Sequence, residues 1–355
     1  MIAARLGAVL IAGMLTLGAP TTAARATTPT LAQLVGQRLI VAFSGTHADA
    51  NLLARVRAGQ VGGVILFGSN VKSPAQLTAL DASLQAAASA GGRPPLIIAT
   101  DQEGGEVKRI PWAPPGRSAK QLGALPSSAS TRAGSLTAAA LHADGVNVDL
   151  APVADVPHGP ADFIEQQQRA FSTNRFTVAA DAPAFAGGLE GHGVWPTLKH
   201  FPGLGLATVS TDQALVRITA PAPALTKGLL PYTIALRRNL NPIVMLSTAV
   251  YPALDWRAAA WSPPIIRGLL RGKLGFAGVT ITDSLDSAAA VRHQSVSGVA
   301  LRSAQSGSDL LLITGSEADS RTVFASLRSA ARSGALPMSQ LMASYNRIIA
   351  LKSHL

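Results

Sequence analysis

The chain has 355 residues, of which 48% are hydrophobic and only 14% are charged, with a net charge of +11 at pH 7. This composition can build a large buried core and excludes disordered and collagen-like proteins. The sequence contains no cysteine, which excludes disulfides, thiolate metal sites and cysteine nucleophiles. It has no dense Lys/Arg run and no helix-turn-helix signature, so nucleic acid is excluded as the partner.

The first 26 residues have the pattern of a secretory signal peptide. Arg5 precedes an apolar run over residues 6–17, and Ala24 and Ala26 form a small-x-small cleavage site before Thr27. A core helix or a membrane anchor is the alternative, but the run is shorter than the ~20 residues of a membrane span. We predict that residues 27–355 are secreted without an integral membrane segment. Their basic charge fits association with an anionic cell wall or membrane surface, and the alternative is a solvated arginine-rich surface without a partner.

Eight short β-branched runs then alternate with helical segments. The predicted strands cover residues 38–43, 63–67, 96–100, 146–150, 195–199, 243–247, 279–282 and 309–313. Most are continuous apolar runs, which are typical of parallel strands buried on both faces. The predicted helices include residues 74–90, 118–143, 178–192, 223–239, 263–274 and 338–355.

Eight strand-then-helix units favour an α/β fold of the (β/α)8 TIM-barrel type over a doubly wound sheet. The sequence after residue 30 has no internal repeat and no Gly/Ser-rich linker, so residues 27–355 are predicted to form one domain. We expect a monomer. Active sites of this fold lie at the carboxyl ends of the strands, which directs attention to the residues found there.

Charged side chains stand at three of these strand ends. Asp101 follows the third predicted strand, Lys199 and His200 end the fifth, and Asp283 follows the seventh. Carboxylates and cations together can hold sugar hydroxyls, and a carboxylate can attack a carbon that bears a leaving group. Alternatively, the aspartates cap helices and the Lys-His pair forms a surface corner. The presence of all four at one barrel rim favours a site.

Five motifs occur in order along the chain, at residues 62–67 (GGVILF), 101–105 (DQEGG), 147–155 (NVDLAPVAD), 199–203 (KHFPG) and 278–285 (GVTITDSL). Over roughly residues 31–320 the sequence resembles the N-terminal barrel of the family 3 glycoside hydrolases, in the single-domain β-N-acetylglucosaminidase (β-N-acetylhexosaminidase) branch. The resemblance implies a retaining hydrolase of terminal β-linked N-acetylhexosaminides. Fragments of the cell wall are one expected substrate, as in peptidoglycan turnover.

The resemblance also implies roles for individual residues. Asp283 matches the nucleophile that forms a covalent glycosyl-enzyme. The positions that match sugar-binding residues of the family are Asp101, Arg109, Arg169, Lys199 and His200. Arg169 is the weakest of these matches, because Ala170 replaces the serine that follows the arginine in the family motif.

One loop departs from the family pattern. After KHFPG, the branch reads approximately HGDTxxDSH, in which the last histidine is the general acid/base and the aspartate two residues before it orients it. Residues 204–212 read LGLATVSTD here, so Ser210 stands at the aspartate position and Asp212 at the histidine position. The acid/base dyad is therefore missing.

Three hypotheses follow from this loop. Asp212 is the acid/base, in an apolar setting that Leu204 and Leu206 supply to keep it protonated. Alternatively, His158 or Glu165 moves in to replace the dyad. The third hypothesis is a barrel that binds a glycan without cleaving it. Apart from the loop, a β-glycosidase of different sugar specificity is an alternative to the N-acetylhexosaminidase. The retained Asp283 favours an enzyme.

We predict no cofactor and no metal. The seven histidines show neither an H-E-x-x-H motif nor a paired spacing. The sequence has no Walker motif, and its Gly-Gly pairs lack the spacing of a dinucleotide-binding fingerprint.

Overall fold

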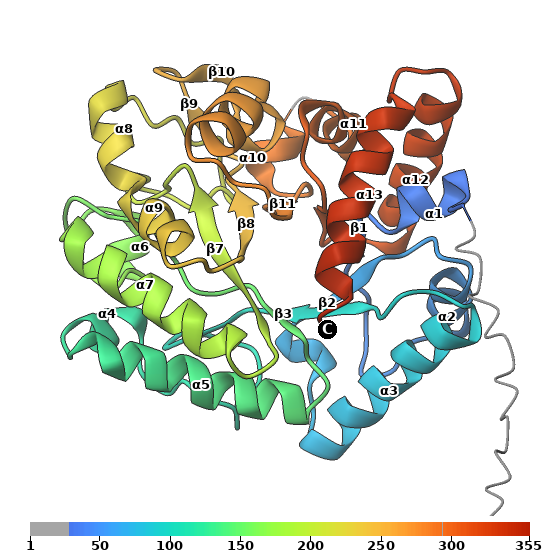
Figure 1. Cartoon of the computed structure of the whole chain (residues 1–355), viewed down its shortest axis with the longest axis horizontal. Helices are drawn as coiled ribbons and strands as arrows, with labels where there is room; N and C mark the ends of the chain where they lie inside the picture. The colour runs from blue at the N-terminus through green and yellow to red at the C-terminus, as the bar shows by residue number, and fades with distance from the viewer. Residues whose placement is uncertain (1–27, 293) are drawn as a thin grey trace, which may run out of the picture.

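A computed structural model describes residues 28–292 and 294–355 of the chain. A ring of parallel strands lies at its centre with helices around it (Figure 1). The strands of the ring are β1 (Leu39–Val41), β2 (Gly63–Leu66), β3 (Ile97–Thr100), β6 (Val148–Asp149), β7 (Trp195–Phe201), β8 (Ile243–Leu246), β11 (Thr280–Thr282) and β12 (Leu311–Ile313).

The order of the strands confirms the barrel. The hydrogen-bonded order is β11-β8-β7-β6-β3-β2-β1-β12, and every paired neighbour is parallel. A parallel bridge between Ile281 of β11 and Leu310 beside β12 joins the two ends. All eight strands coincide with the predicted runs, and they form a single α/β barrel domain.

The larger helices pack outside the strands (Figure 1). They are α1 (Leu31–Gly36), α2 (Ala50–Arg57), α3 (Pro74–Ala90), α4 (Ala119–Gly123), α5 (Ser127–Ala143), α7 (Arg175–Glu190), α8 (Ala222–Gly228), α9 (Leu230–Arg237), the π-helix η3 (Pro264–Lys273), α11 (Val296–Ser306), α12 (Glu317–Arg332) and α13 (Met338–Lys352). Two predicted helices are each divided in two. Pro126 precedes α5 and Pro231 lies in the first turn of α9, where a residue without an N–H begins a new helix more easily than it continues one.

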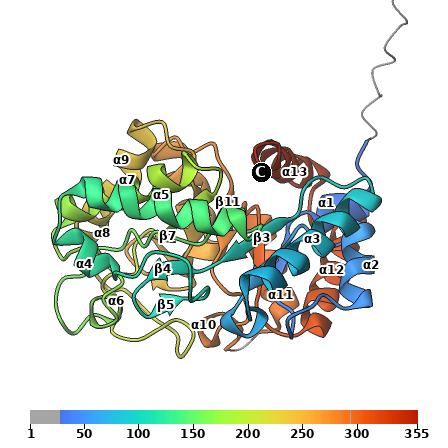
Figure 2. The same ribbon diagram turned by 90° about the horizontal axis from the view of Figure 1, so that it is seen from below.

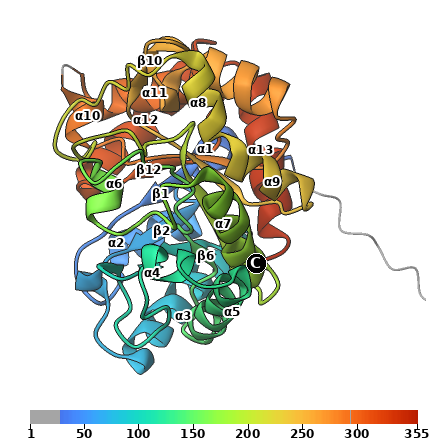
Figure 3. The ribbon, with the colours of Figure 1, turned by 90° about the vertical axis from the view of Figure 1, so that its left-hand side faces the viewer.

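Short elements after the barrel strands lie at one end of the domain. They are the hairpin β4 (Gln102–Gly104) and β5 (Val107–Lys108), helices α6 (Phe163–Gln166) and α10 (Ala288–Val291), and the hairpin β9 (Val250–Tyr251) and β10 (Asp255–Ala258). Figure 2 shows β4, β5, α6 and α10 on the side away from the carboxyl end of α13, and Figure 3 shows α6 and α10 on that same side. This side carries the carboxyl ends of the strands.

Both faces of the strands are buried, which explains their continuous apolar sequences. Inward-facing side chains such as Ile40, Ile65 and Ile97 fill the barrel interior. Their neighbours Leu39, Val41 and Val64 belong to the larger core between strands and helices. Parallel barrels of this kind have a packed interior and no pore.

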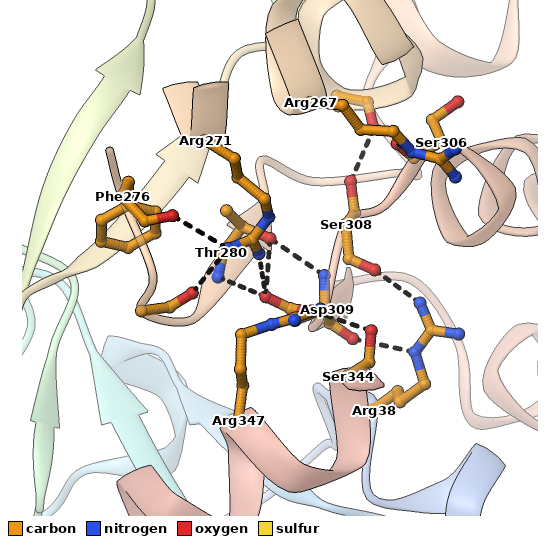
Figure 4. Close-up of polar contacts among 12 residues, drawn as sticks. Arg38, Arg267, Arg271, Phe276, Thr280, Ser306, Ser308, Asp309, Ser344 and Arg347 are labelled. Atoms are coloured by element: carbon orange, nitrogen blue, oxygen red, sulfur yellow. Dashed lines mark hydrogen bonds and ion pairs between the residues drawn. The ribbon is translucent and has the colours of Figure 1, made fainter. Parts of the chain in front are cut away.

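A buried aspartate ties the last strands and helices together at the other end of the barrel (Figure 4). Asp309 accepts hydrogen bonds from Arg271 of η3 (2.7 Å), and from Ser344 (2.8 Å) and Arg347 (2.7 Å) of α13. It also accepts the N–H of Thr280, the first residue of β11, at 2.9 Å. Because two guanidinium groups and several hydrogen-bond donors surround it, this carboxylate is stable inside the fold.

The predicted signal peptide, residues 1–26, lies outside the described residues. Within residues 28–292 and 294–355, no helix is long and apolar enough to cross a membrane.

Candidate active site

A pocket of about 520 Å³ lies at the carboxyl ends of the barrel strands. Residues from at least five different strand-to-helix connections line it, as is usual for active sites of this fold. All seven residues that the sequence singled out contribute to its lining: Asp101, Arg109, Arg169, Lys199, His200, Asp212 and Asp283.

The strands explain this convergence. Asp101 directly follows β3, and Asp283 directly follows β11. Lys199 and His200 lie near the carboxyl end of β7, just before its last residue Phe201. The carboxyl ends of parallel barrel strands meet at one rim, so these side chains meet. The alternative of helix caps is wrong, because Ser118 caps the helix after β3 and Ser287 caps the helix after β11. The surface-corner alternative is also wrong, because Lys199 and His200 are buried.

Lys199 lies at the centre of an ionic cluster. Its Nζ atom is 2.7 Å from Asp101 Oδ1 and 2.7 Å from Glu103 Oε1. Arg169 donates to both oxygens of Glu103 at 2.7 Å, in a bidentate arrangement that fixes the guanidinium plane. Burial opposes ionisation of Glu103, but Arg169 and Lys199 outweigh it and hold the pKa of Glu103 well below its usual range. The cluster therefore presents oriented charges to the pocket.

Glu103 was not singled out from the sequence, although it lies in the same DQEGG motif as Asp101. Its side chain links Lys199 of β7 to Arg169 of the loop after α6. The only sequence signal for Glu103 was that the motif contains a second carboxylate besides Asp101.

A second carboxylate missed by the sequence analysis holds His200. The fully buried Asp155 places Oδ2 2.7 Å from His200 Nδ1, while its Oδ1 accepts the backbone N–H groups of His200 (3.1 Å) and Leu204 (2.6 Å). With Nδ1 engaged, Nε2 is the ring nitrogen that remains for a ligand. Asp155 is the last residue of the motif at 147–155, which was its only sequence signal.

Asp283 lies half-buried in the wall of the pocket. Its Oδ1 accepts the N–H of Ser284 at 2.8 Å, and its Oδ2 accepts a longer hydrogen bond from Thr211 Oγ1 at 3.4 Å. Burial raises the pKa of the Asp283 carboxyl, and the nearby Asp212 raises it further, whereas His200 and Lys199 lower it. The Lys199 ammonium and the donors Ser284 and Thr211 oppose this rise and favour the ionised form that a nucleophile needs.

The loop that departs from the family pattern places Asp212 on the rim of the same pocket. Asp212 is exposed, and its Oδ2 accepts a hydrogen bond from Ser210 Oγ at 3.3 Å. The expected apolar setting is wrong: Leu204 lines this pocket, but Leu206 lines a different one, so the two leucines do not enclose Asp212.

The other acid/base candidates lie elsewhere. His158 is exposed and lines the second pocket, and Glu165 makes an ion pair with Lys120 at 2.5 Å. Neither lines the pocket that holds Asp283, which leaves Asp212 as the better placed of the three. Within the described part of the chain, no group of three or more His, Asp or Glu side chains is arranged to hold a metal ion.

Comparisons with known proteins agree with this fold and pocket. The model of the glycosyl hydrolase family 3 N-terminal domain matches residues 30–351. A protein of Arthroderma benhamiae named as an uncharacterized secreted glycosyl hydrolase is 35% identical over 334 residues, which are 92% of this chain and 94% of that protein. A β-hexosaminidase of Xanthomonas oryzae pv. oryzae is 32% identical over 286 residues, with 78% of this chain and 83% of that protein covered.

Solved structures show the same relationship. A β-N-acetylhexosaminidase from Beutenbergia cavernae has a TM-score of 0.85 at 32% identity, with coverage of 92% of this chain and 99% of that one. A family 3 β-N-acetylglucosaminidase from Paenibacillus has a TM-score of 0.87 at 30% identity, and the match covers 92% of this chain but 63% of that longer chain. Together with these comparisons, a barrel with a pocket of carboxylates and cations at its strand ends indicates a glycosidase. This chain belongs to glycosyl hydrolase family 3, and it resembles the β-N-acetylhexosaminidases of that family.

Proposed function

We propose that this chain hydrolyses terminal β-linked N-acetylhexosaminides with retention of configuration, through a covalent glycosyl-enzyme on Asp283. The observation that carries the proposal is the position of the Asp283 carboxylate in the wall of the pocket that Lys199, His200 and Asp212 also line. This arrangement gives the two carboxylates that a retaining glycosidase uses.

The ionic cluster around Lys199 binds the sugar. Asp101 accepts hydrogen bonds from sugar hydroxyls, and Lys199 and Arg169 donate to sugar oxygens. Arg109 and His200 Nε2 complete the set of polar groups at the pocket wall. Because Glu103 and Asp155 fix these side chains before the sugar arrives, little ordering remains to be done on binding.

The chemistry takes two steps. In the first, an oxygen of Asp283 forms a bond to the anomeric carbon, the glycosidic C–O bond breaks, and the departing oxygen receives a proton from Asp212. In the second, water attacks the same carbon and gives its proton to Asp212, while the bond to Asp283 breaks and restores the carboxylate.

Asp212 replaces a histidine as the acid/base in this proposal. General acid/base help is typically worth about 10²–10⁴-fold in rate. A departing sugar needs this proton, whereas an aryl leaving group such as nitrophenolate departs readily without it. The enzyme is therefore expected to be sensitive to the leaving group.

The test compares wild type with Asp283→Asn on an aryl N-acetyl-β-glucosaminide and an aryl β-glucoside. Wild type should cleave the first substrate much faster, and Asp283→Asn should lose turnover while circular dichroism shows an intact fold. Asp49→Asn is the matched control, because Asp49 is exposed, caps α2, and can be replaced by another good cap. Wild-type turnover by Asp283→Asn contradicts the nucleophile assignment, and preference for the glucoside contradicts the sugar class.

The missing dyad supports a second candidate, a glycan-binding barrel without catalysis. Ser210 and Asp212 stand where the family has its acid/base pair. If wild type cleaves neither aryl substrate but binds N-acetylglucosamine in calorimetry, and Lys199→Gln abolishes that binding, this candidate replaces the hydrolase.

We also propose that residues 1–26 are a signal peptide and that the mature enzyme acts outside the cytoplasm as a monomer on cell-wall fragments. The N-terminal pattern, the basic charge and the secreted relative support this proposal. Intact-mass analysis of the secreted protein should place its start near Thr27, and light scattering should give the monomer mass. Recovery of only the full-length chain from the cytoplasm contradicts export. Failure to release N-acetylhexosamine from purified wall fragments contradicts the substrate.

A further inference from the structure

A second pocket, of about 440 Å³, lies beside the catalytic pocket. The segment that follows β7 separates the two. Leu204 lines the catalytic pocket, whereas its neighbours Gly203 and Gly205 line the second one. The first residues of α7 and the last residues of α8 form the remaining walls.

This dividing segment is firmly held. The N–H of Leu204 donates to Asp155 at 2.6 Å, and Tyr251 donates through its hydroxyl to the carbonyl of Gly203 at 3.1 Å. Gly205 packs so closely on the backbone of Val156 that a Cβ atom would lie 2.3 Å from the Val156 carbonyl oxygen. The second pocket is therefore a distinct space, bounded by a fixed wall.

The two pockets differ in charge. Carboxylates and cations together line the catalytic pocket, whereas the charged side chains of the second pocket are Arg175 and Lys227, with the titratable His158 beside them. Among the described residues that line the second pocket, none is acidic. Across residues 28–292 and 294–355, Arg175 and Lys227 make no ion pair within 4.0 Å. Their charges are available to a ligand.

The same pocket offers apolar contact. Leu206 and Leu225 line it, and so does Phe176, whose side chain is unusual for a large hydrophobic residue in being 62% exposed. The Arg175 guanidinium lies 4.6 Å from the centre of the Phe176 ring, which places a cation directly beside an open aromatic surface. A ligand can thus meet charge and apolar surface together.

We propose that this second pocket is a binding site for a small organic anion, a molecule with a negatively charged group on an apolar or aromatic body. The cations from α7 and α8 bind the charged group, and Phe176 and the two leucines bind the body. A neutral sugar is a poor occupant, because the pocket lacks the carboxylates that accept hydrogen bonds from sugar hydroxyls. The proposal does not depend on the catalytic activity.

The test uses two dyes of nearly the same shape. 8-Anilinonaphthalene-1-sulfonate is an aromatic anion, and N-phenyl-1-naphthylamine is its neutral counterpart; both gain fluorescence in an apolar site. Lys227→Gln should weaken binding of the anionic dye about two- to fivefold, and Arg175→Gln/Lys227→Gln by more. Lys227→Glu should weaken it further than Lys227→Gln, and Lys227→Arg should restore wild-type affinity. Binding of the neutral dye should not change.

Lys273→Gln provides the matched control, because Lys273 is an exposed lysine in the last turn of η3 that lies outside this pocket. It should bind the anionic dye like wild type. The proposal is overturned if the anionic dye does not bind at micromolar concentrations. Equal affinity of wild type, Lys227→Glu and the double variant overturns it as well.

Discussion

Asp155 contacts His200 through both of its carboxylate oxygens: one lies 2.7 Å from the ring nitrogen Nδ1, and the other accepts the backbone N–H at 3.1 Å. The carboxylate keeps the proton on Nδ1 and leaves Nε2 as an acceptor towards the pocket. In Asp155→Asn an amide N–H faces Nδ1, which favours the opposite tautomer. We expect kcat/KM on an aryl substrate to fall about 10- to 100-fold, the value of a hydrogen bond to a charged group.

Asp49→Asn is again the control, and thermal unfolding shows whether Asp155→Asn is folded at the assay temperature. A folded Asp155→Asn variant with wild-type kcat/KM contradicts a positioning role for Asp155.

Asp212→Ala should separate two classes of substrate. Loss of the proton donor should slow cleavage of a disaccharide by about 10²–10⁴-fold, while an aryl glycoside with a good leaving group should lose far less in its first step. The measurement is kcat/KM for both substrates. Gln213→Ala, at the next exposed position of the same pocket, is the control and should affect both substrates little. Equal losses on the two substrates mean that Asp212 is not the acid.

Asp149 should make the stability of the protein depend on pH. It is fully buried on β6, and its Oδ1 accepts the N–H of Gln102 at 3.0 Å. Burial raises the pKa of Asp149 to about 8. Because this carboxyl ionises near pH 4 when the chain is unfolded, the folded state keeps its proton while the unfolded state loses it. Stability from this group is therefore complete below about pH 4 and is lost as the pH rises towards about 8.

Asp149→Asn removes that titration. Urea unfolding at several values between about pH 5 and pH 8 should show wild type losing stability relative to the variant, by at most about 1.4 kcal/mol per pH unit. A constant difference between the two proteins across this range contradicts a protonated Asp149.

Asp309→Ala should be strongly destabilising. The substitution leaves the partly buried Arg271 and Arg347 without the buried carboxylate that pairs with both (Figure 4), and breaking a buried ion pair typically costs about 3–5 kcal/mol of unfolding free energy. Arg321→Ala breaks an ion pair with Glu317 at the surface, where Arg321 is 54% exposed, and should cost less than about 1 kcal/mol. Chemical denaturation measures both. Similar losses in the two variants contradict a structural role for Asp309.

The barrel could be predicted because strands buried on both faces have continuous apolar sequences. Strands such as β2 and β8 consist of four consecutive buried residues, and their runs are visible without any knowledge of their neighbours. Residues at strand ends, such as Asp283, were found by the same route, since the fold brings all such ends to one rim.

The supporting carboxylates could not be found in this way. Glu103 and Asp155 act on side chains that lie far away in sequence, and only tertiary packing brings them together. The environment of Asp212 was mispredicted for a related reason. Leu204 and Leu206 are two residues apart, but the loop turns between them, and they line different pockets. Loop direction is set by contacts such as that of Gly205 with Val156, which composition does not reveal.

The packed barrel interior also limits the path by which a polysaccharide can enter and leave the pocket. Ile40, Ile65 and Ile97 fill the centre of the ring. At the far end the side-chain nitrogen of Lys352 is buried and donates to the side chain of Gln37 and the carbonyl of Gly62, both at 2.6 Å. Under the proposed mechanism, a sugar that reaches Asp283 has no exit beneath it, so the product leaves by the mouth through which the substrate entered. A polysaccharide chain cannot pass through the packed domain, so the proposed reaction requires each product to leave before the next chain end can enter.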